Sequence, residues 1–190
     1  IERAGGAMSI ALDRKKQGAL IAVDPAMAEN GSLYKSVDDA YRDKIFELCR
    51  MADIVMPNFT EGKMLAGLDM SLEPNEANAR MILKILDHNG FKKVLLSGIM
   101  KGTKQGTATL SEGRIALQMN ESYPEYIHGA GDCLSSAFIG KLLSGMSFES
   151  AAQAAVDFCK ECIRVSVGEK VDLRFGLLIE RAIPMLVEKQ

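Results

Sequence analysis

Three short apolar runs, each ended by polar or turn-forming residues, constrain the fold of this 190-residue chain more than any other feature. They cover residues 19–23, 54–56 and 93–96. A strand with one wet face alternates polar and apolar residues, whereas an unbroken apolar run suits a strand buried on both faces of a parallel sheet. The runs therefore predict three interior strands of a mostly parallel sheet.

Amphipathic stretches and turn residues surround these strands. We predict helices at residues 1–17, 39–51, 60–65, 74–88, from 134 onward, at 148–166 and at 176–188, a loop at 26–36, and a hairpin of strands 106–110 and 114–119 around Glu112-Gly113. Strand and helix alternate three times before the hairpin, an order typical of α/β proteins with a layered sheet. Because we find no repeat and no linker-like stretch, we predict a single domain over residues 1–190.

Composition limits the classes of partner. A net charge of −2 provides no basic surface for nucleic acid, and no apolar run is long enough to span a bilayer. Four cysteines in a chain of this length do not make a dense disulfide framework, and we find no signal peptide. We expect a cytoplasmic protein without nucleic-acid or membrane partners. Because the chain opens at Ile1 rather than at a methionine, we also expect a fragment, or the ordered part of a longer protein.

The segment from His128 to Asp132 places two glycines and a carboxylate directly before a helix-like run. Glycine lets the backbone approach a ligand closely, and a helix that starts here directs free N–H groups and its dipole toward an anion. A carboxylate beside an anion site has a use if Asp132 takes a proton from a hydroxyl that attacks a phosphate. The segment equally suits an ordinary loop in which Asp132 is the N-cap of the helix.

Polar residues follow the three predicted strands: Asp24, then Asn58 with Glu61, then Ser97 with Gly98. The carboxyl ends of parallel strands share one edge of a sheet, so these groups and the glycine segment can converge. Asn58 and Glu61 lie three residues apart, and their oxygens suit Mg²⁺, although this spacing also fits a helix N-terminal cap. The convergence of four groups favours phosphoryl transfer, which needs a metal, an anion cradle and a base.

Several of these segments resemble the pyridoxal kinase family. The segments are 23–27 (Val-Asp-Pro-Ala-Met), 30–34 (Asn-Gly-Ser-Leu-Tyr), 52–61 (Ala-Asp-Ile-Val-Met-Pro-Asn-x-x-Glu), 128–132 (His-Gly-Ala-Gly-Asp) and 172–176 (Asp-x-Arg-Phe-Gly). The last of them is similar to the tail of the pyridoxamine kinases of Gram-positive-type bacteria. The resemblance runs along the whole chain and matches about the C-terminal two-thirds of the family chain. Ala130 stands where pyridoxal kinases usually have threonine.

The resemblance implies a fold and an activity. The family belongs to the ribokinase-like superfamily, which implies a three-layer α/β/α architecture with a mostly parallel central sheet flanked by helices. It implies an ATP-dependent kinase that phosphorylates the 5′-hydroxymethyl group of a vitamin B6 vitamer (pyridoxal, pyridoxamine or pyridoxine). It also implies Mg²⁺, a monovalent cation such as K⁺, and a homodimer. Relative to the family, the chain lacks the N-terminal strands and the lid region.

The resemblance also implies a role for each candidate residue. Asp132 would be the general base and would contact the substrate, and His128 would contact the substrate or brace the loop. The anion hole would consist of Gly129, Ala130 and Gly131. Glu61 and Asp24 would organise Mg²⁺, and the ATP phosphates would lie near Asp24, Asn58, Glu61, Ser97 and Gly98.

Other functions stay open. A hydroxymethylpyrimidine kinase of thiamine synthesis shares the fold, but it often has cysteine at the position of Asp132, which favours the vitamin B6 interpretation. A sugar kinase of the superfamily is a third possibility. A homologue that binds nucleotide or pyridoxal phosphate without catalysis belongs to a different class, and the presence of Asn58, Glu61 and Asp132 argues against it.

The cysteines carry a weaker signal. Cys159 and Cys162 form one Cys-x-x-Cys pair inside a predicted helix, which favours small core residues over a zinc or redox site. Cys133 follows Asp132 at a predicted helix start, where a thiol pKa can fall. We expect incidental reactivity of Cys133 rather than a catalytic role.

Overall fold

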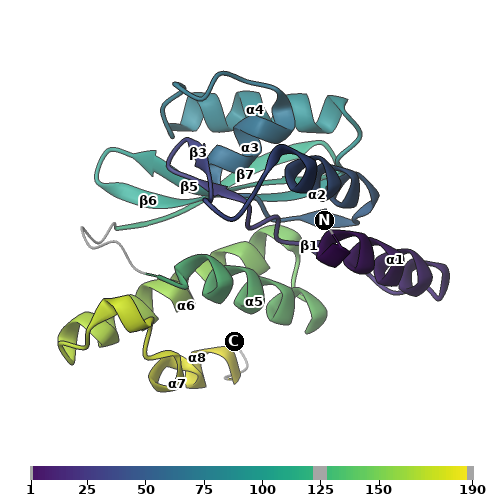
Figure 1. Cartoon of the computed structure of the whole chain (residues 1–190). Helices are drawn as coiled ribbons and strands as arrows, with labels where there is room; N and C mark the ends of the chain where they lie inside the picture. The colour runs from purple at the N-terminus through teal and green to yellow at the C-terminus, as the bar shows by residue number, and fades with distance from the viewer. Residues whose placement is uncertain (1, 122–127, 188–190) are drawn as a thin grey trace. The chain divides into compact units, whose positions relative to one another are not determined.

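The computed structural model describes residues 2–121 and 128–187 (Figure 1). The chain divides into two compact units, which are described separately below. The first contains Ile1–Ile99 with Ala108–Ile115, and the second contains Met100–Thr107 with Ala116–Gln190. Among the described residues, no helix is both long enough and apolar enough to cross a membrane.

The central sheet has five strands in the order β1-β4-β5-β6-β7. The strands are β1 (Ala22–Val23), β4 (Ile54–Val55), β5 (Lys93–Lys101), β6 (Lys104–Ser111) and β7 (Arg114–Glu121). β1 pairs in parallel with β4, and β4 in parallel with β5, which confirms the prediction of a mostly parallel sheet. The core of the first unit is built on these strands, because Ile54, Val94 and Leu96 are completely buried.

Two strand boundaries differ from the prediction by three residues or more. β1 begins three residues later than predicted, because the carboxylate of Asp53 accepts a hydrogen bond from the backbone N–H of Ile21. β5 continues to Lys101, so Ser97 and Gly98 lie within the strand and not at its end. The extension begins with pairing to the neighbouring segment, since the backbone N–H of Ser97 donates to the carbonyl of Pro57 at 3.0 Å.

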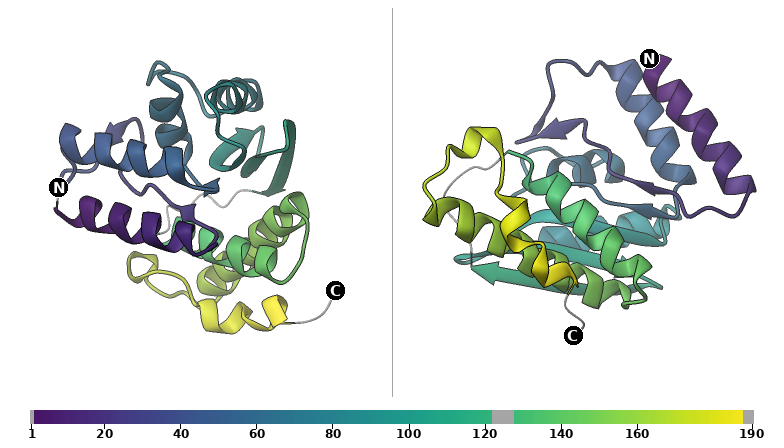
Figure 2. Two further views of the ribbon diagram at one scale, coloured as in Figure 1. Left: turned by 90° about the vertical axis from the view of Figure 1, so that its right-hand side faces the viewer. Right: turned by 90° about the horizontal axis from the view of Figure 1, so that it is seen from below.

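The first unit contains the helices α1 (Glu2–Lys16), α2 (Asp39–Met51), α3 (Phe59–Ala66) and α4 (Glu76–His88). α1 and α2 run side by side, and α3 lies beside α4 (Figure 2). All four helices were expected, although residue 1 lies outside the described residues. α4 begins at Glu76 rather than at Pro74, because the side chain of Asn75 accepts a hydrogen bond from the backbone N–H of Asn78 and so caps the helix.

The predicted loop at 26–36 is wrong in part, because it contains a small hairpin. β2 (Ala28–Glu29) pairs antiparallel with β3 (Ser32–Leu33). The turn residues Asn30 and Gly31 both have positive φ, 50° and 81°, as a two-residue hairpin turn requires. Met27 and Ala28 are completely buried beside this hairpin, which makes the segment a fixed part of the first unit.

The predicted hairpin around Glu112-Gly113 is confirmed. Glu112 and Gly113 join β6 to β7, and their φ angles of 52° and 75° again match a two-residue turn. Both strands are longer than predicted.

The second unit contains α5 (Ala130–Leu143) and α6 (Phe148–Gly168), which pack against each other (Figure 1). The rings of Phe138 and Phe148 meet edge to face with centroids 4.9 Å apart. One face of α6 is buried, since Ala151, Ala155 and Phe158 are buried. α5 starts at Ala130, so Ala130, Gly131 and Asp132 lie in the first turn of the helix instead of preceding it.

The predicted helix at 176–188 is wrong in part, because residues 179–182 and 184–187 are helical but form two separate helices; residue 188 lies outside the described residues. The structure has a 3₁₀ turn η1 (Leu173–Phe175) and two short helices, α7 (Ile179–Ala182) and α8 (Pro184–Val187). Gly176 has a φ of 102°, which no helix accommodates, and Pro184 begins a new helix because it has no N–H to continue the previous one.

Candidate functional site

Asn58 and Glu61 form a reciprocal cap at the start of α3. The side-chain Oδ1 of Asn58 accepts a hydrogen bond from the backbone N–H of Glu61 at 3.0 Å. In return, Oε2 of Glu61 accepts from the backbone N–H of Asn58 at 2.9 Å. The capping interpretation of this pair is therefore confirmed, and the arrangement holds both side chains in one orientation.

Glu61 also ties the cap to the segment that follows β1. Its Oε1 accepts hydrogen bonds from the backbone N–H groups of Met27 at 2.7 Å and Ala28 at 3.2 Å. The side-chain amide of Asn58 donates to the carbonyl of Ala28 at 2.7 Å. The Glu61 side chain is almost completely buried, at 1% exposure. Glu61 therefore acts as a clamp that fixes residues 27–28 to the start of α3.

Thr60, which is not among the predicted site residues, extends this clamp. Its hydroxyl Oγ1 accepts a hydrogen bond from the backbone N–H of Gly31 at 3.0 Å, which fixes the tip of the β2–β3 hairpin. In the sequence, the Asn30-Gly31 pair indicates the hairpin that Thr60 contacts, because this dipeptide is typical of tight hairpin turns.

Asp24 and Glu61 form an acidic pair at the end of β1. Burial raises the pKa of Glu61, and the charge of Asp24 raises it further, while hydrogen bonds from Asn58, Met27 and Ala28 act in the opposite direction. Asp24 itself is exposed. A divalent cation would relieve the repulsion between the two carboxylates, so the pair fits Mg²⁺, which prefers oxygen ligands.

The acidic pair does not complete a metal site. Within the described ranges, no group of three or more His, Cys, Asp or Glu side chains is arranged to hold a metal ion. A cation at Asp24 and Glu61 would take its other ligands from phosphate oxygens and water, the usual arrangement for Mg²⁺ in phosphoryl-transfer sites. The assignment of both residues to Mg²⁺ stays a prediction.

Ser97 and Gly98 lie next to the cap although they are inside β5. Ser97 forms a parallel bridge with Asn58. Gly98 has a φ of 76°, and a side-chain carbon at this position would lie 3.8 Å from the backbone nitrogen of Phe59. The first unit therefore brings Asp24, Asn58, Glu61, Ser97 and Gly98 together, while their role in binding ATP stays a prediction.

The glycine segment of the second unit opens α5. Gly129 is the N-cap residue, with a left-handed φ of 80° and no side-chain hydrogen bond to the first N–H groups of the helix. The alternative in which Asp132 is the N-cap is wrong, because Asp132 is the third residue of the helix. Gly129 thus provides no side-chain cap for the N-terminal N–H groups of α5, and such groups can bind an anion.

The carboxylate of Asp132 is exposed in the first turn of α5. Among the residues that the structure describes, it has no hydrogen bond and no ion pair. His128 is exposed as well, directly before the N-cap. A carboxylate in this position can accept a proton from a ligand without first breaking a contact.

Gly131 has no structural reason to be a glycine. Its φ is not positive, and among the described residues nothing lies within 4 Å of the position a side-chain carbon would take. Glycine inside a helix lowers stability by roughly 0.5–1 kcal/mol relative to alanine. The open space beside Gly131 agrees with close approach of a ligand to the backbone.

The two groups of predicted site residues belong to different units. Asp24, Asn58 and Glu61 with Ser97 and Gly98 belong to the first unit, and residues 128–132 belong to the second. Their convergence at one site stays a prediction.

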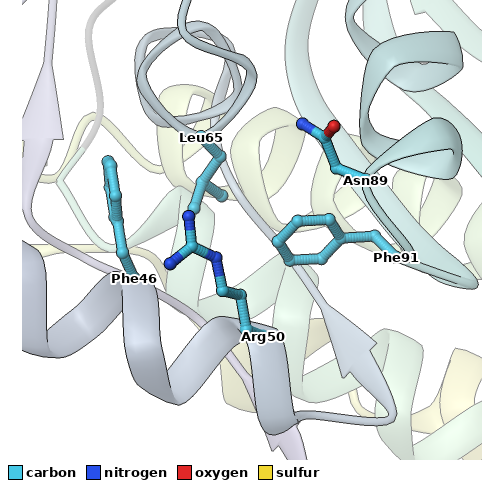
Figure 3. A pocket seen from close by; sticks show the side chains of 5 residues that line it. All are labelled: Phe46, Arg50, Leu65, Asn89 and Phe91. Atoms are coloured by element: carbon cyan, nitrogen blue, oxygen red, sulfur yellow. The ribbon is translucent and has the colours of Figure 1, made fainter.

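A pocket of about 270 Å³ lies elsewhere in the first unit (Figure 3). Phe46, Arg50, Leu65, Asn89 and Phe91 line it, and none of them is a predicted site residue. Phe91 precedes β5, so the pocket lies toward the amino end of that strand, whereas Asp24 and Asn58 follow the carboxyl ends of β1 and β4. The pocket is therefore separate from the candidate site.

Comparison with solved structures supports the ribokinase-like fold. A crystal structure described as a putative phosphomethylpyrimidine kinase from Bacteroides thetaiotaomicron superposes with a TM-score of 0.92 at 24% identity, covering 99% of this chain and 66% of that one. Pyridoxal kinase from Lactobacillus plantarum gives a TM-score of 0.78 at 23% identity, covering 88% of this chain and 62% of that one. The predicted α/β, ribokinase-like class is confirmed.

Sequence comparison identifies the family. The hydroxymethylpyrimidine/phosphomethylpyrimidine kinase of Haemophilus influenzae is 27% identical over 158 residues, which are 78% of this chain and 56% of the relative. A probable thiamine biosynthetic bifunctional enzyme, chloroplastic, of Oryza sativa is 29% identical over 154 residues, 77% of this chain and 27% of the relative. The chain thus spans about half of the first relative and about a quarter of the second. The family model described as phosphomethylpyrimidine kinase matches residues 6–174, and the chain therefore belongs to the phosphomethylpyrimidine kinase family.

Proposed function

We propose that this protein is an ATP-dependent kinase that transfers the γ-phosphoryl group to the 5′-hydroxymethyl group of a vitamin B6 vitamer. The observation that carries the proposal is the start of α5, where the N-cap residue is a glycine and the carboxylate of Asp132 has no partner among the described residues. An anion-binding helix end and a free base are the two groups that in-line transfer to an alcohol requires.

The proposal assigns a role to each of the candidate residues. Asp132 accepts the proton of the attacking hydroxyl, and the backbone N–H groups from Gly129 to Gly131 stabilise the charge on the moving phosphoryl group. Asn58 and Glu61, with Ser97 and Gly98, shape the binding region for the ATP phosphates. Asp24 and Glu61 hold Mg²⁺, which when bound neutralises phosphate charge. His128 borders the acceptor.

A hydroxymethylpyrimidine kinase is the second candidate. The matched family model and the two sequence relatives are named for pyrimidine substrates, which favours it. In the other direction, one crystal form of the Bacteroides protein is described as containing pyridoxal. Both acceptors carry a hydroxymethyl group on a nitrogen-containing aromatic ring, so Asp132 would do the same chemistry on either. A cytoplasmic homodimer that uses K⁺ beside the glycine segment belongs to the same proposal.

An acceptor panel tests the proposal. We expect the full-length gene product to convert ATP to ADP only in the presence of an acceptor, and to phosphorylate pyridoxal, pyridoxamine or pyridoxine faster than hydroxymethylpyrimidine. Coupled detection of ADP, with mass spectrometry of the phosphorylated product, measures this. Faster turnover of hydroxymethylpyrimidine would select the second candidate. Binding of ATP without phosphorylation of any of the four would contradict both and leave a sugar kinase or a binding protein.

Gly131 provides a test that separates binding from folding. Gly131→Ala should raise helix stability by about 0.5–1 kcal/mol, because glycine is unfavourable within a helix. The same methyl group should lower kcat/KM by about 10-fold or more, since close positioning of the phosphoryl group is worth that much. Urea unfolding and steady-state kinetics measure the two effects.

Gly140 is the matched control for Gly131. It also lies within α5, and among the described residues nothing lies within 4 Å of its side-chain position. Gly140→Ala should bring the same gain in stability with unchanged kcat/KM. Equal kinetics in the two variants would contradict the assignment of Gly131 to the anion hole.

A further inference from the structure

Three cysteines that are separated in the sequence come together between α5 and α6. Cys133 lies in the first turn of α5, and Cys159 and Cys162 lie on α6. Both α6 thiols are close enough to Cys133 to lower the pKa of its thiol. The Sγ of Cys159 also lies 3.9 Å from the carbonyl oxygen of Ala130, in the same turn of α5. All three cysteines are in the second unit, so the cluster does not depend on the first.

The cluster is neither a disulfide nor a metal site in this structure. The three cysteines are free thiols. No group of three or more potential ligands in the described part of the chain has an arrangement that could hold a metal ion. Two neighbouring thiols can undergo reversible oxidation to a disulfide.

Cys133 is the reactive member of the cluster. Hydrogen bonds from Cys159 and Cys162 lower the pKa of Cys133 and thereby favour its thiolate, which is the nucleophilic form. The pKa values of Cys159 and Cys162 are raised, chiefly by their contact with Cys133, so these two remain protonated. The uncapped N-terminus of α5 adds a favourable dipole at Cys133.

Cys49 serves as an internal reference. It is in the first unit, is completely buried and has no cysteine partner among the described residues. Burial raises its pKa to about 12, so the thiolate is rare near neutral pH. Cys133 has 5% of its surface exposed, whereas Cys49 has none.

We propose that Cys133, Cys159 and Cys162 form a peroxide-sensitive thiol site, in which Cys133 becomes linked by a disulfide to one of the two α6 cysteines. The thiolate of Cys133 attacks hydrogen peroxide, so that an S–O bond forms and the O–O bond breaks. The hydroxide that leaves takes up a proton and becomes water. The neighbouring thiol then attacks the sulfenic sulfur, the S–S bond forms, and a second water leaves. Two thiols are oxidised and one peroxide is reduced to two waters; a dithiol reductant reverses the reaction.

The disulfide would act on the turn that holds Asp132. A disulfide places the two sulfur atoms about 2.0 Å apart, closer than hydrogen-bonded thiols, so its formation pulls the first turn of α5 toward α6. Asp132 directly precedes Cys133, and Gly131 lies one residue further. This consequence rests on the proposed function, and it predicts that oxidation lowers kinase activity.

Peptide mapping tests the thiol site without any use of the activity. We expect one equivalent of hydrogen peroxide to remove two hydrogens from the protein and to produce a peptide that links Cys133 to Cys159 or Cys162, with Cys49 unmodified. In the double variant Cys159→Ala/Cys162→Ala, Cys133 should instead accumulate as a sulfenic acid that dimedone traps. Oxidation of Cys49 at the same rate as Cys133, or no disulfide in the wild-type protein, would overturn the proposal.

Activity after oxidation tests the connection with the turn. Because a displacement of about 1 Å can cost up to roughly 10²-fold in rate, we expect oxidised protein to lose at least about 10-fold in kcat and to recover it with dithiothreitol. The Cys49→Ala variant should behave like the wild type. Full disulfide formation with unchanged kcat would overturn this connection. If the reduced protein lacks kinase activity, the proposed function is refuted. Peptide mapping would still test whether the disulfide forms at the thiol site.

Discussion

Replacing Asp132 with asparagine should lower kcat by about 10²- to 10⁴-fold, because the variant keeps the shape of the side chain but cannot accept a proton. The carboxylate of Asp132 has no partner among the described residues, so the substitution breaks no contact and the fold should be unaffected. Binding of ATP should be retained, since the backbone N–H groups of α5 do not depend on this side chain. Steady-state kinetics and ATP titration by calorimetry measure the two quantities.

The matched control is Glu149→Gln. Glu149 is a carboxylate in the first turn of α6, the other long helix of the second unit, and α6 is capped by the side chain of Ser147. A carboxylate in a first turn interacts with the helix dipole by about 0.3–1 kcal/mol, and both substitutions remove this contribution. Glu149→Gln should leave kcat unchanged. A loss of less than about 10-fold in Asp132→Asn would contradict general-base catalysis and leave Asp132 a role in helix stability.

Replacing Glu61 with alanine should lower the free energy of unfolding by about 2 kcal/mol or more, because several buried backbone N–H groups lose their acceptor. These groups belong to Asn58, Met27 and Ala28. Glu61→Gln should have an intermediate effect, since its one oxygen still accepts from residues 27–28 while its amide group cannot accept from Asn58. Urea unfolding measures the series.

Glu47→Ala is the control for this series. Glu47 lies on α2 and pairs with Lys44 at 3.1 Å, with both side chains largely exposed. Pairs of this kind contribute about 0–1 kcal/mol, so the control should change stability little. If Glu61→Ala were no more destabilising than Glu47→Ala, Glu61 would not be the clamp that we describe. In that case its contribution would be confined to the binding of Mg²⁺ and ATP.

Local patterns in the sequence predicted much of the fold. The apolar run at 54–56, the amphipathic helices up to α6 and the Glu112-Gly113 turn each depend on residues within a few positions of one another, and the structure contains them, whereas the helix predicted at 176–188 is divided into two short ones. Local patterns also indicated that Asn58 and Glu61 form a cap, because a capping box is completed within four residues. The β2–β3 hairpin has a local signal as well, the Asn30-Gly31 dipeptide, although we predicted residues 26–36 as a loop.

Long-range contacts could not be predicted in this way. Glu61 accepts a hydrogen bond from Met27, 34 residues earlier, and no spacing rule connects two such positions. The contact of Cys133 with Cys159 and Cys162 likewise exists only because α5 packs on α6. Periodicity alone favoured buried core cysteines, and all three are indeed buried. It could not show that their sulfur atoms meet.

The sequence by itself determined the α/β class and most of the order of the elements, and it indicated candidate residues for phosphoryl transfer, whose roles stay a prediction. Those properties follow from hydrophobic periodicity and from short motifs, which are encoded within single turns and strands. Only the tertiary structure decided that Glu61 is a buried clamp, that Asp132 lies inside the first turn of α5 rather than at its cap, and that three thiols share one cluster. The physical reason is that burial and pairing depend on which surfaces pack together, and packing joins residues that the chain itself keeps far apart.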